Sequence, residues 1–195
     1  MSKELSEMTL EELWQLFPIS LVPHKSSWEK QYRGMEQSLK ELLSGFPVLR
    51  ISHIGSTAIK NIMAKDILDV LVEFPKCADL HAAAQLLEAK GFIIMSSGPG
   101  RVSLNKGYTK DGFADEVFHI HLRHAGDNDE LYFRDYLNEY PETAREYERL
   151  KLKLWKEYEH DRDAYTAGKT AFVKETAARA REKYGDRYAP AETGR

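Results

Sequence analysis

Cysteine is almost absent from this chain, which contains only Cys77. A single thiol forms neither an internal disulfide nor a cysteine-based zinc site, so the sequence predicts a protein of a reducing compartment. No apolar run approaches the roughly 20 residues that cross a bilayer. The opening segment, MSKELSEMTLEELW, is acidic and polar where a signal peptide is basic and then apolar. We therefore expect a cytoplasmic protein without a membrane segment.

An excess of positive charge is also missing. The chain has 28 Lys and Arg residues against 31 Asp and Glu residues, a formal net charge of -3 at pH 7. Binding to nucleic acid in general depends on a basic surface that releases counterions, so this activity is not expected. A nucleotide or another phosphate-bearing small molecule needs only a local group of cations. The sequence leaves the oligomeric state open.

Strand patterns gather in the middle of the chain, and helical patterns fill both ends. Apolar runs predict strands at 48–54, 67–74, 92–95, 102–108 and 116–123. Helical periodicity predicts helices at 9–17, 27–44, 77–90, 129–139, 142–159 and 162–183, with capping-box spacing at Thr9/Glu12 and Ser26/Glu29. This order predicts an α+β fold in which helices back a mixed β-sheet and the C-terminal half is helical.

The same pattern suggests four regions along the chain. We expect an N-terminal helical extension at 1–20, an α/β core at 21–126, a C-terminal helical region at 127–187 and a flexible tail at 188–195. The length of 195 residues suits one ordinary domain with a helical extension.

The most informative segment is ISHIGSTAIKNIMAKDILDVLVE, residues 51–73. A predicted strand ends at Ile54, and Gly55, Ser56 and Thr57 then open a turn into a short helix. Glycine lets the backbone approach a bulky group, and the free N–H groups and hydroxyls of such a turn suit a phosphate. The alternative is that Ser56 or Thr57 only caps the helix.

The next predicted strand carries a carboxylate, Asp69, inside the apolar run ILDVLV. Burying a charge is costly unless it is paired or bound to a metal. Asp69 therefore lies either at an exposed strand end or among ligands. We predict that it is a catalytic residue and a metal ligand that shares a cavity with the Gly-Ser turn.

Several segments together resemble one protein family: LVPHKSSWEKQY, HIGSTAI, AKDILDVLV, FHIHL, YFRDYL, EYERLK and DRDAYTAGKTAF. From about Leu21 to Tyr184 the chain is similar to the GrpB family (UPF0157), a branch of the nucleotidyltransferase superfamily. The resemblance implies a nucleotidyltransferase-like fold and either metal-dependent nucleotidyl transfer to an unknown acceptor or nucleotide binding. The family usually has Pro-Gly where this chain has Lys60-Asn61, and we expect Lys60 to be solvated.

The pair of aspartates that active nucleotidyltransferases use is incomplete. An Asp-x-Asp spacing places both carboxylates on one strand face, where they hold two magnesium ions. Here Leu71 takes the second place. Glu73 lies about 13 Å along the strand from Asp69, at roughly 3.3 Å per residue, and Asp66 lies on the other face. A catalytically degenerate binding module is therefore an alternative, and such a module would fold nearly unchanged with Leu71→Asp.

His119 and His121, in FHIHL, offer a substitute metal site. Their spacing places both rings on one strand face, about 7 Å apart at the backbone. With Asp69 they predict a site for a divalent metal, Mg or Mn in nucleotidyl transfer, and Zn or another transition metal if the histidines ligate. A transition-metal hydrolase is thus a further alternative, as is a polar groove that binds substrate oxygens. We expect His53 to be a hydrogen-bonded structural residue.

Cations on the C-terminal helices complete the predicted site. Tyr165 and Lys169 are four residues apart, as are Tyr147 and Lys151, so each pair shares a helix face. Such cations can neutralise phosphate, although a solvated face with i,i+4 pairing gives the same pattern. The predicted phosphate-binding residues here are Arg134, Lys151, Tyr165 and Lys169, with Arg101 and Lys106 as further candidates.

Overall fold

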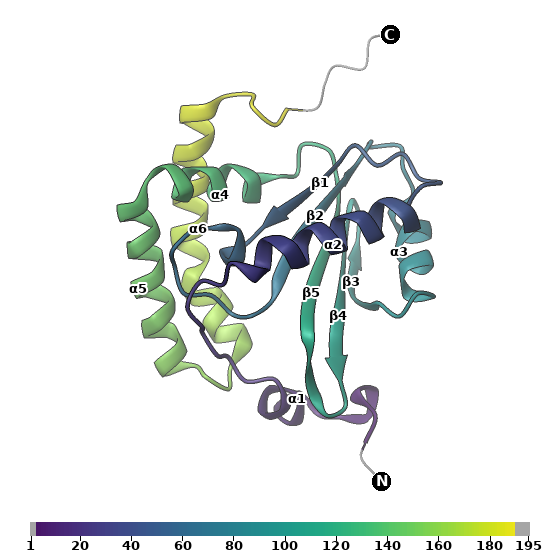
Figure 1. The fold of residues 1–195 in the computed structure, drawn as a ribbon, viewed down its shortest axis with the longest axis horizontal. Coiled ribbons are helices and arrows are strands. Elements are labelled where there is room, and N and C mark those ends of the chain that lie inside the picture. Colours follow the sequence, from purple (N-terminus) through teal and green to yellow (C-terminus); the bar gives the residue numbers. More distant parts are fainter. Residues whose placement is uncertain (1–2, 190–195) are drawn as a thin grey trace.

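The computed structural model describes residues 3–189 and shows a five-stranded sheet with helices on both of its faces (Figure 1). The strands are β1 (Arg50–Ile54), β2 (Leu68–Phe74), β3 (Ile93–Gly98), β4 (Arg101–Thr109) and β5 (Gly112–His124). The helices are α1 (Leu10–Leu16), α2 (Ser27–Leu42), α3 (Leu80–Glu88), α4 (Asp129–Glu139), α5 (Pro141–Glu157) and α6 (Arg162–Tyr184), with short 3₁₀ turns η1 (Leu5–Glu7) and η2 (Ser56–Ala58). The predicted α+β class, with its mixed sheet and helical C-terminal half, is confirmed.

The sheet has the order β1-β2-β5-β4-β3. β2 and β5 are parallel, and every other neighbouring pair is antiparallel. The parallel register places Asp69 beside His119 and Leu71 beside His121. Because paired residues on neighbouring strands project from the same face, this one pair of strands brings the three predicted metal ligands to the same side of the sheet.

The two faces of β2 have different roles. Val70 and Val72 are fully buried in the main core, where they pack with residues of α2 and α3. Asp69, Leu71 and Glu73 project from the opposite face. The C-terminal helices α4, α5 and α6 lie on that side of the sheet (Figure 1). The alternation therefore supplies the core with one face of β2 and the candidate site with the other.

Of the two capping boxes predicted from the sequence, the one at Thr9 is confirmed and the one at Ser26 is wrong. The Thr9 hydroxyl accepts a hydrogen bond from the Glu12 N–H, and the Glu12 carboxylate accepts one from the Thr9 N–H. Ser26 already has a helical backbone and its side chain caps nothing, so no capping box forms there. The strand predicted at 116–123 is longer, because β5 begins at the hairpin turn and pairs with β4 from Gly112 onward.

A β-bulge interrupts the β4–β5 hairpin near its tip. The register shifts between Lys106 and Tyr108, where β5 has extra residues opposite β4. Gly107 lies at the shift with a φ of 88°, and a side chain there would collide with the carbonyl oxygen of Glu116. Bulges of this kind redirect the side chains of the longer strand.

The C-terminal segment is held across β1 and β2. The carbonyl oxygen of Tyr188 accepts hydrogen bonds from Arg50 at 3.3 Å and from Asn128 at 2.9 Å. Asn128 also donates to Glu73, a fully buried carboxylate that is paired with Arg50. The tail predicted at 188–195 thus begins with an anchored residue, and residues 190–195 lie outside the described part of the chain. Within residues 3–189, no helix has the length and apolar character that a membrane crossing requires.

Candidate metal and phosphate site

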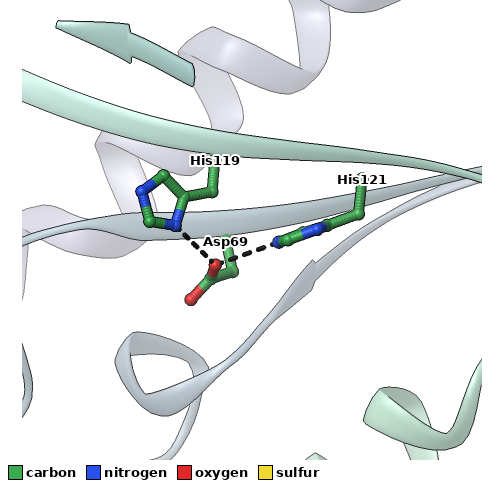
Figure 2. A group of neighbouring side chains, drawn as sticks. All are labelled: Asp69, His119 and His121. Atoms are coloured by element: carbon green, nitrogen blue, oxygen red, sulfur yellow. Dashed lines mark hydrogen bonds and ion pairs between the residues drawn. The ribbon is translucent and has the colours of Figure 1, made fainter. Parts of the chain in front are cut away.

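One carboxylate and two imidazoles converge between β2 and β5 (Figure 2). The Oδ1 atom of Asp69 lies 3.3 Å from His119 Nδ1 and 3.1 Å from His121 Nε2. Potential ligand atoms of the three residues all lie within 4.8 Å of one another. The structure therefore brings together the three side chains that the sequence pattern singled out, and their role as metal ligands stays a prediction.

The protonation states of this group suit a cation. Burial raises the pKa of Asp69, but hydrogen bonds and charge interactions with His119 and His121 outweigh it and hold the pKa well below its ordinary value. Burial lowers the pKa of His119 against the opposing pull of Asp69. At neutral pH Asp69 is therefore a carboxylate and His119 is a neutral imidazole. These are the forms that metal ligation requires.

Each imidazole is also held from behind. His119 Nε2 lies 2.8 Å from the hydroxyl of Tyr108, which accepts a hydrogen bond from Arg162 at 3.0 Å. His121 Nδ1 lies 3.4 Å from the guanidinium of Arg123. Hydrogen bonds to the far nitrogen of a histidine orient its ring. Both rings are thus supported from the side opposite the carboxylate.

The Gly-Ser turn lies directly beside the strand carboxylate. The register pairs Ile54 with Asp69, and Gly55 follows with a φ of 71°. A Cβ atom on Gly55 would lie 2.9 Å from Cβ and Cγ of Asp69, closer than real Cβ atoms approach, so only glycine fits. Gly55, Ser56 and Asp69 line one cavity. The turn and the acid therefore share a space, as the sequence pattern predicted.

This cavity has a volume of about 490 Å³ and extends from the Asp69 group to α5 and α6. Its cationic lining residues are Lys65, Lys151, Arg162 and Lys169. Its acidic lining residues are Asp69, Glu130 and Asp163, and its aromatic ones are Phe133, Tyr147 and Tyr165. A cavity of this composition suits an anion with an extended organic part.

No pattern in the sequence pointed to Lys65. Its ammonium group lies 5.4 Å from the centre of the Tyr165 ring, and Lys169 lies 5.2 Å from the same ring. Burial, with Lys169 and Arg162 nearby, lowers the pKa of Lys65 to about 7. A single lysine before a strand looks like any solvated lysine, so only the packing of α6 over this segment reveals it.

Lys151 lines the cavity but also has a structural role. The side chain is fully buried, its ammonium donates a hydrogen bond to the Met63 carbonyl, and burial lowers its pKa to about 7. Glu148, from the same helix, accepts a hydrogen bond from the Met63 N–H at 2.5 Å. α5 thus holds both backbone polar groups of one residue, Met63, in the segment that connects β1 to β2.

Two residues predicted to bind phosphate are engaged elsewhere. Thr57 is buried, and its hydroxyl lies 2.9 Å from His53 Nε2. Arg134 donates to the His53 carbonyl at 2.9 Å and pairs with Asp135. The geometry brings neither residue to the cavity, because Thr57 contacts the His53 ring and Arg134 binds the His53 carbonyl behind the turn. His53 is the expected structural residue, since it is buried and stacks on Tyr32 at 4.9 Å.

The remaining candidate cations also lie apart from the Asp69 group. Arg101 pairs with Asp127, and the Lys106 ammonium lies 4.6 Å from the centre of the Phe92 ring. Lys60 is exposed, as expected.

The position of the missing second aspartate is closed to solvent. Leu71 is fully buried and packs with Ile54, Leu131 and Tyr188. An aspartate there would place a carboxylate in an apolar cluster, so the structure argues against the expectation that Leu71→Asp leaves folding nearly unchanged. Glu73 is occupied by its ion pair with Arg50 and does not supply a second metal carboxylate.

The fold and site define an α+β protein with an Asp-His-His group that opens into a cavity lined by cations. The chain belongs to the GrpB family, because the family model described as "GrpB protein" matches residues 18–179. The Glutamate-rich protein GrpB of Alkalihalophilus pseudofirmus is 34% identical over 167 residues, which cover 80% of this chain and 92% of that protein. The family predicted from the sequence is therefore confirmed.

One solved structure of the same family agrees with this assignment. The crystal structure of conserved protein GrpB from Enterococcus faecalis matches with a TM-score of 0.71 at 30% identity, over 85% of this chain and 99% of that chain. The Cid1 poly (U) polymerase with MgGTP bound matches with a TM-score of 0.47 at 15% identity, over 75% of this chain and 46% of that chain.

Proposed function

We propose that the cavity binds a nucleotide, or another phosphate-bearing small molecule, against a single divalent transition metal held by Asp69, His119 and His121. One observation carries the proposal: this group lies in the same cavity as the Gly-Ser turn and the cations of α6. A metal group alone would suit many ligands, and a cationic cavity alone would suit many anions. Because the metal group and the cations lie in one cavity, a ligand that carries phosphate is favoured.

The donor set fits a transition metal better than magnesium. Two imidazoles and one carboxylate suit zinc, manganese, iron or nickel. Donor atoms bound tetrahedrally at about 2.0–2.2 Å from one ion stand about 3.3–3.6 Å apart. The distances from Asp69 Oδ1 to His121 Nε2 and to His119 Nδ1, 3.1 and 3.3 Å, are close to that spacing. With Leu71 buried at the second aspartate position, the residues fit one ion and not a pair.

A bound divalent ion supplies a Lewis acid that polarises a phosphoryl oxygen. The side chains of this chain supply the other functions. Lys169 and Arg162, both on α6, neutralise phosphate oxygens, and Ser56 donates its hydroxyl at the turn. Lys65, whose pKa is lowered to about 7, takes up a proton when an anion enters. These roles describe binding and charge neutralisation before phosphoryl transfer or hydrolysis.

The cavity becomes strongly attractive to anions only when the metal is present. Four of its lining residues are Lys or Arg and three are acidic, so their charges nearly balance. A divalent ion at Asp69 shifts that balance to positive. We therefore expect nucleotide binding to depend on the metal.

Thermal unfolding tests this dependence. A nucleoside triphosphate should raise the Tm only when Mn²⁺ or Zn²⁺ is also present, and Asp69→Asn should abolish the rise. Asp111→Asn, a matched change in the exposed hairpin turn, should preserve it. A wild-type Tm that is unchanged by every nucleoside triphosphate with Mn²⁺, Zn²⁺, Ni²⁺ or Fe²⁺ contradicts the proposal.

Product analysis then separates transfer from hydrolysis. With a triphosphate labelled in the nucleoside, transfer appears as label attached to an acceptor, and hydrolysis appears as a labelled nucleotide with fewer phosphates. Either product should disappear with His119→Ala and persist with His160→Ala, which changes an exposed histidine.

A metal-free binding role for the same cavity is the second candidate, and one observation favours it. Arg123 faces His121 Nδ1 and therefore favours a proton on Nε2, the nitrogen that points at Asp69. That proton occupies the direction in which a metal would be bound. In this case the protein binds nucleotide equally well in EDTA and contains no metal after growth in medium supplemented with zinc and manganese. One bound metal per chain excludes it.

A further inference from the structure

A second cavity adjoins the one that contains Asp69. Its volume is about 190 Å³, and it extends toward the N-terminal segment and the β4–β5 hairpin. Lys65, Ile67 and Arg162 line both cavities. Lys65 and Arg162 therefore lie between the two cavities. A ligand that occupied both cavities would pass beside these two cations.

The second cavity has a different chemistry from the first. Its apolar lining residues include Pro18, Ile19, Val22, Phe113 and Val117. Its two acids are Asp66 and Asp115. Asp66 is bound by Lys25 and by the indole N–H of Trp28, whereas the Asp115 side chain is exposed. Carboxylates repel phosphate, so this space suits the neutral, apolar end of a ligand that also offers a hydrogen-bond donor.

Phe113 supplies a flat surface in this cavity. Its ring centre lies 4.9 Å from that of Phe17 and 5.2 Å from that of Tyr108, yet the residue is 40% exposed. The ring is thus supported by neighbours and still accessible. Figure 1 shows the tip of the β4–β5 hairpin, which carries Phe113, beside α1. Aromatic side chains presented in this way stack on nucleobases.

We propose that the second cavity holds the nucleobase of a nucleotide whose phosphates occupy the Asp69 cavity. Phe113 stacks on the base, and the Asp115 carboxylate accepts a hydrogen bond from its exocyclic amino group. Lys65 and Arg162 meet the phosphates where the two cavities join. The inference rests on the proposed function, and it deepens it by naming the ligand class: nucleotides with an amino-bearing base, adenine, cytosine or guanine.

Equilibrium binding in Mn²⁺ tests the assignment with ATP, CTP, UTP and inorganic tripolyphosphate. ATP should bind about tenfold more tightly than tripolyphosphate, because only ATP fills the second cavity. UTP should bind several-fold more weakly than ATP or CTP, since its base presents carbonyl oxygens to Asp115. Phe113→Ala should reduce the affinity for ATP to that for tripolyphosphate and leave tripolyphosphate binding unchanged.

Three further variants make the test specific. Asp115→Asn should remove the preference for ATP over UTP, while Glu116→Gln, an equal charge change at an exposed neighbour outside the cavity, should retain it. Phe113→Leu keeps apolar volume without a flat ring, so it should also lose affinity for ATP even if Phe113→Ala fails to fold.

The outcomes separate this inference from the proposed function. Equal affinities for ATP and tripolyphosphate, or an equal loss of both with Phe113→Leu, overturn the base site and leave the phosphate site standing. If the wild-type protein binds none of the four compounds, the proposed function fails and the base site fails with it.

Discussion

Gly55 and Asp69 lie so close together that the glycine position has no space for a side chain. Gly55 has a backbone conformation that other residues rarely adopt, and a Cβ atom there would meet Cβ and Cγ of Asp69 at 2.9 Å. The turn after β1 and the acid of β2 are therefore one structural unit. Any ligand held at the turn lies beside the carboxylate.

Gly55→Ala should destabilise the protein and weaken metal binding. The combination of φ 71° and ψ −170° is almost restricted to glycine, and forcing alanine into it costs about 1–3 kcal/mol. The added methyl group must also displace Asp69. Urea unfolding and Mn²⁺ titration measure the two effects. Gly34→Ala, within α2 where a Cβ meets nothing within 4 Å, should instead stabilise the protein by up to about 1 kcal/mol. Equal stabilities of the two variants would contradict this account.

The sequence predicted the parts of the site better than their assembly. Asp69 is visible as a lone carboxylate in an apolar run, and the spacing of His119 and His121 places both on one strand face. Their meeting depends on β2 and β5 being parallel neighbours, although β3 and β4 lie between them in the chain. Strand order is a long-range property that local periodicity does not contain.

The same limit explains the individual misses. Lys65 and Arg162 are brought to the cavity by the packing of α6, which no short motif encodes. Thr57 and Arg134 carry the right chemistry for phosphate, but their side chains satisfy polar groups of the backbone and of His53. Residue type and spacing predict which groups are available, and tertiary contacts decide which of them are already used.

Leu71→Asp should strongly destabilise the protein and should not restore a second metal site. Leu71 is fully buried with Ile54 and Leu131, and Leu71→Ala alone should cost roughly 2–5 kcal/mol. The aspartate adds the cost of burying a charge, so it should be the less stable variant at neutral pH. Chemical denaturation of both variants separates the effect of the lost apolar side chain from the effect of the buried charge. A Leu71→Asp protein as stable as the wild type would show that α4 can move away from this face.

His53 should make the protein less stable in mild acid. Burial lowers its pKa from 6.5 to about 4, so between these values the unfolded chain takes up a proton that the folded chain does not. Stability should therefore fall as the pH decreases from 6.5 to 4, by at most about 3 kcal/mol from this residue. The lowered pKa of His119 acts in the same direction.

Denaturant midpoints at pH 7 and pH 4.5 measure this contribution. His53→Gln keeps a polar partner for Thr57 without a titrating ring, so it should reduce the loss of stability between pH 7 and pH 4.5. His160→Gln, which changes an exposed histidine, should behave like the wild type. A pH dependence unaltered by His53→Gln would assign the acid sensitivity to other groups.

Lys151 should make the protein more stable as the solution becomes mildly alkaline. Burial lowers its pKa from 10.5 to about 7, so between these values the unfolded chain holds a proton that the folded chain has released. Each pH unit within this window is worth up to about 1.4 kcal/mol for one such lysine. Lys65, with a pKa also lowered to about 7, contributes with the same sign.

Lys151→Met tests this contribution because it keeps the apolar stem and removes the titrating group. Between pH 7 and 9 its gain in stability should be smaller than that of the wild type, yet not zero, because Lys65 remains. Lys153→Met, at an exposed position of the same helix, should show the full gain. Lys151→Met also removes the donor to the Met63 carbonyl. This loss lowers stability equally at every pH and so does not alter the slope of stability against pH. Identical slopes for wild type and Lys151→Met would mean that Lys151 stays charged when buried, and the cavity would then carry a permanent cation at α5.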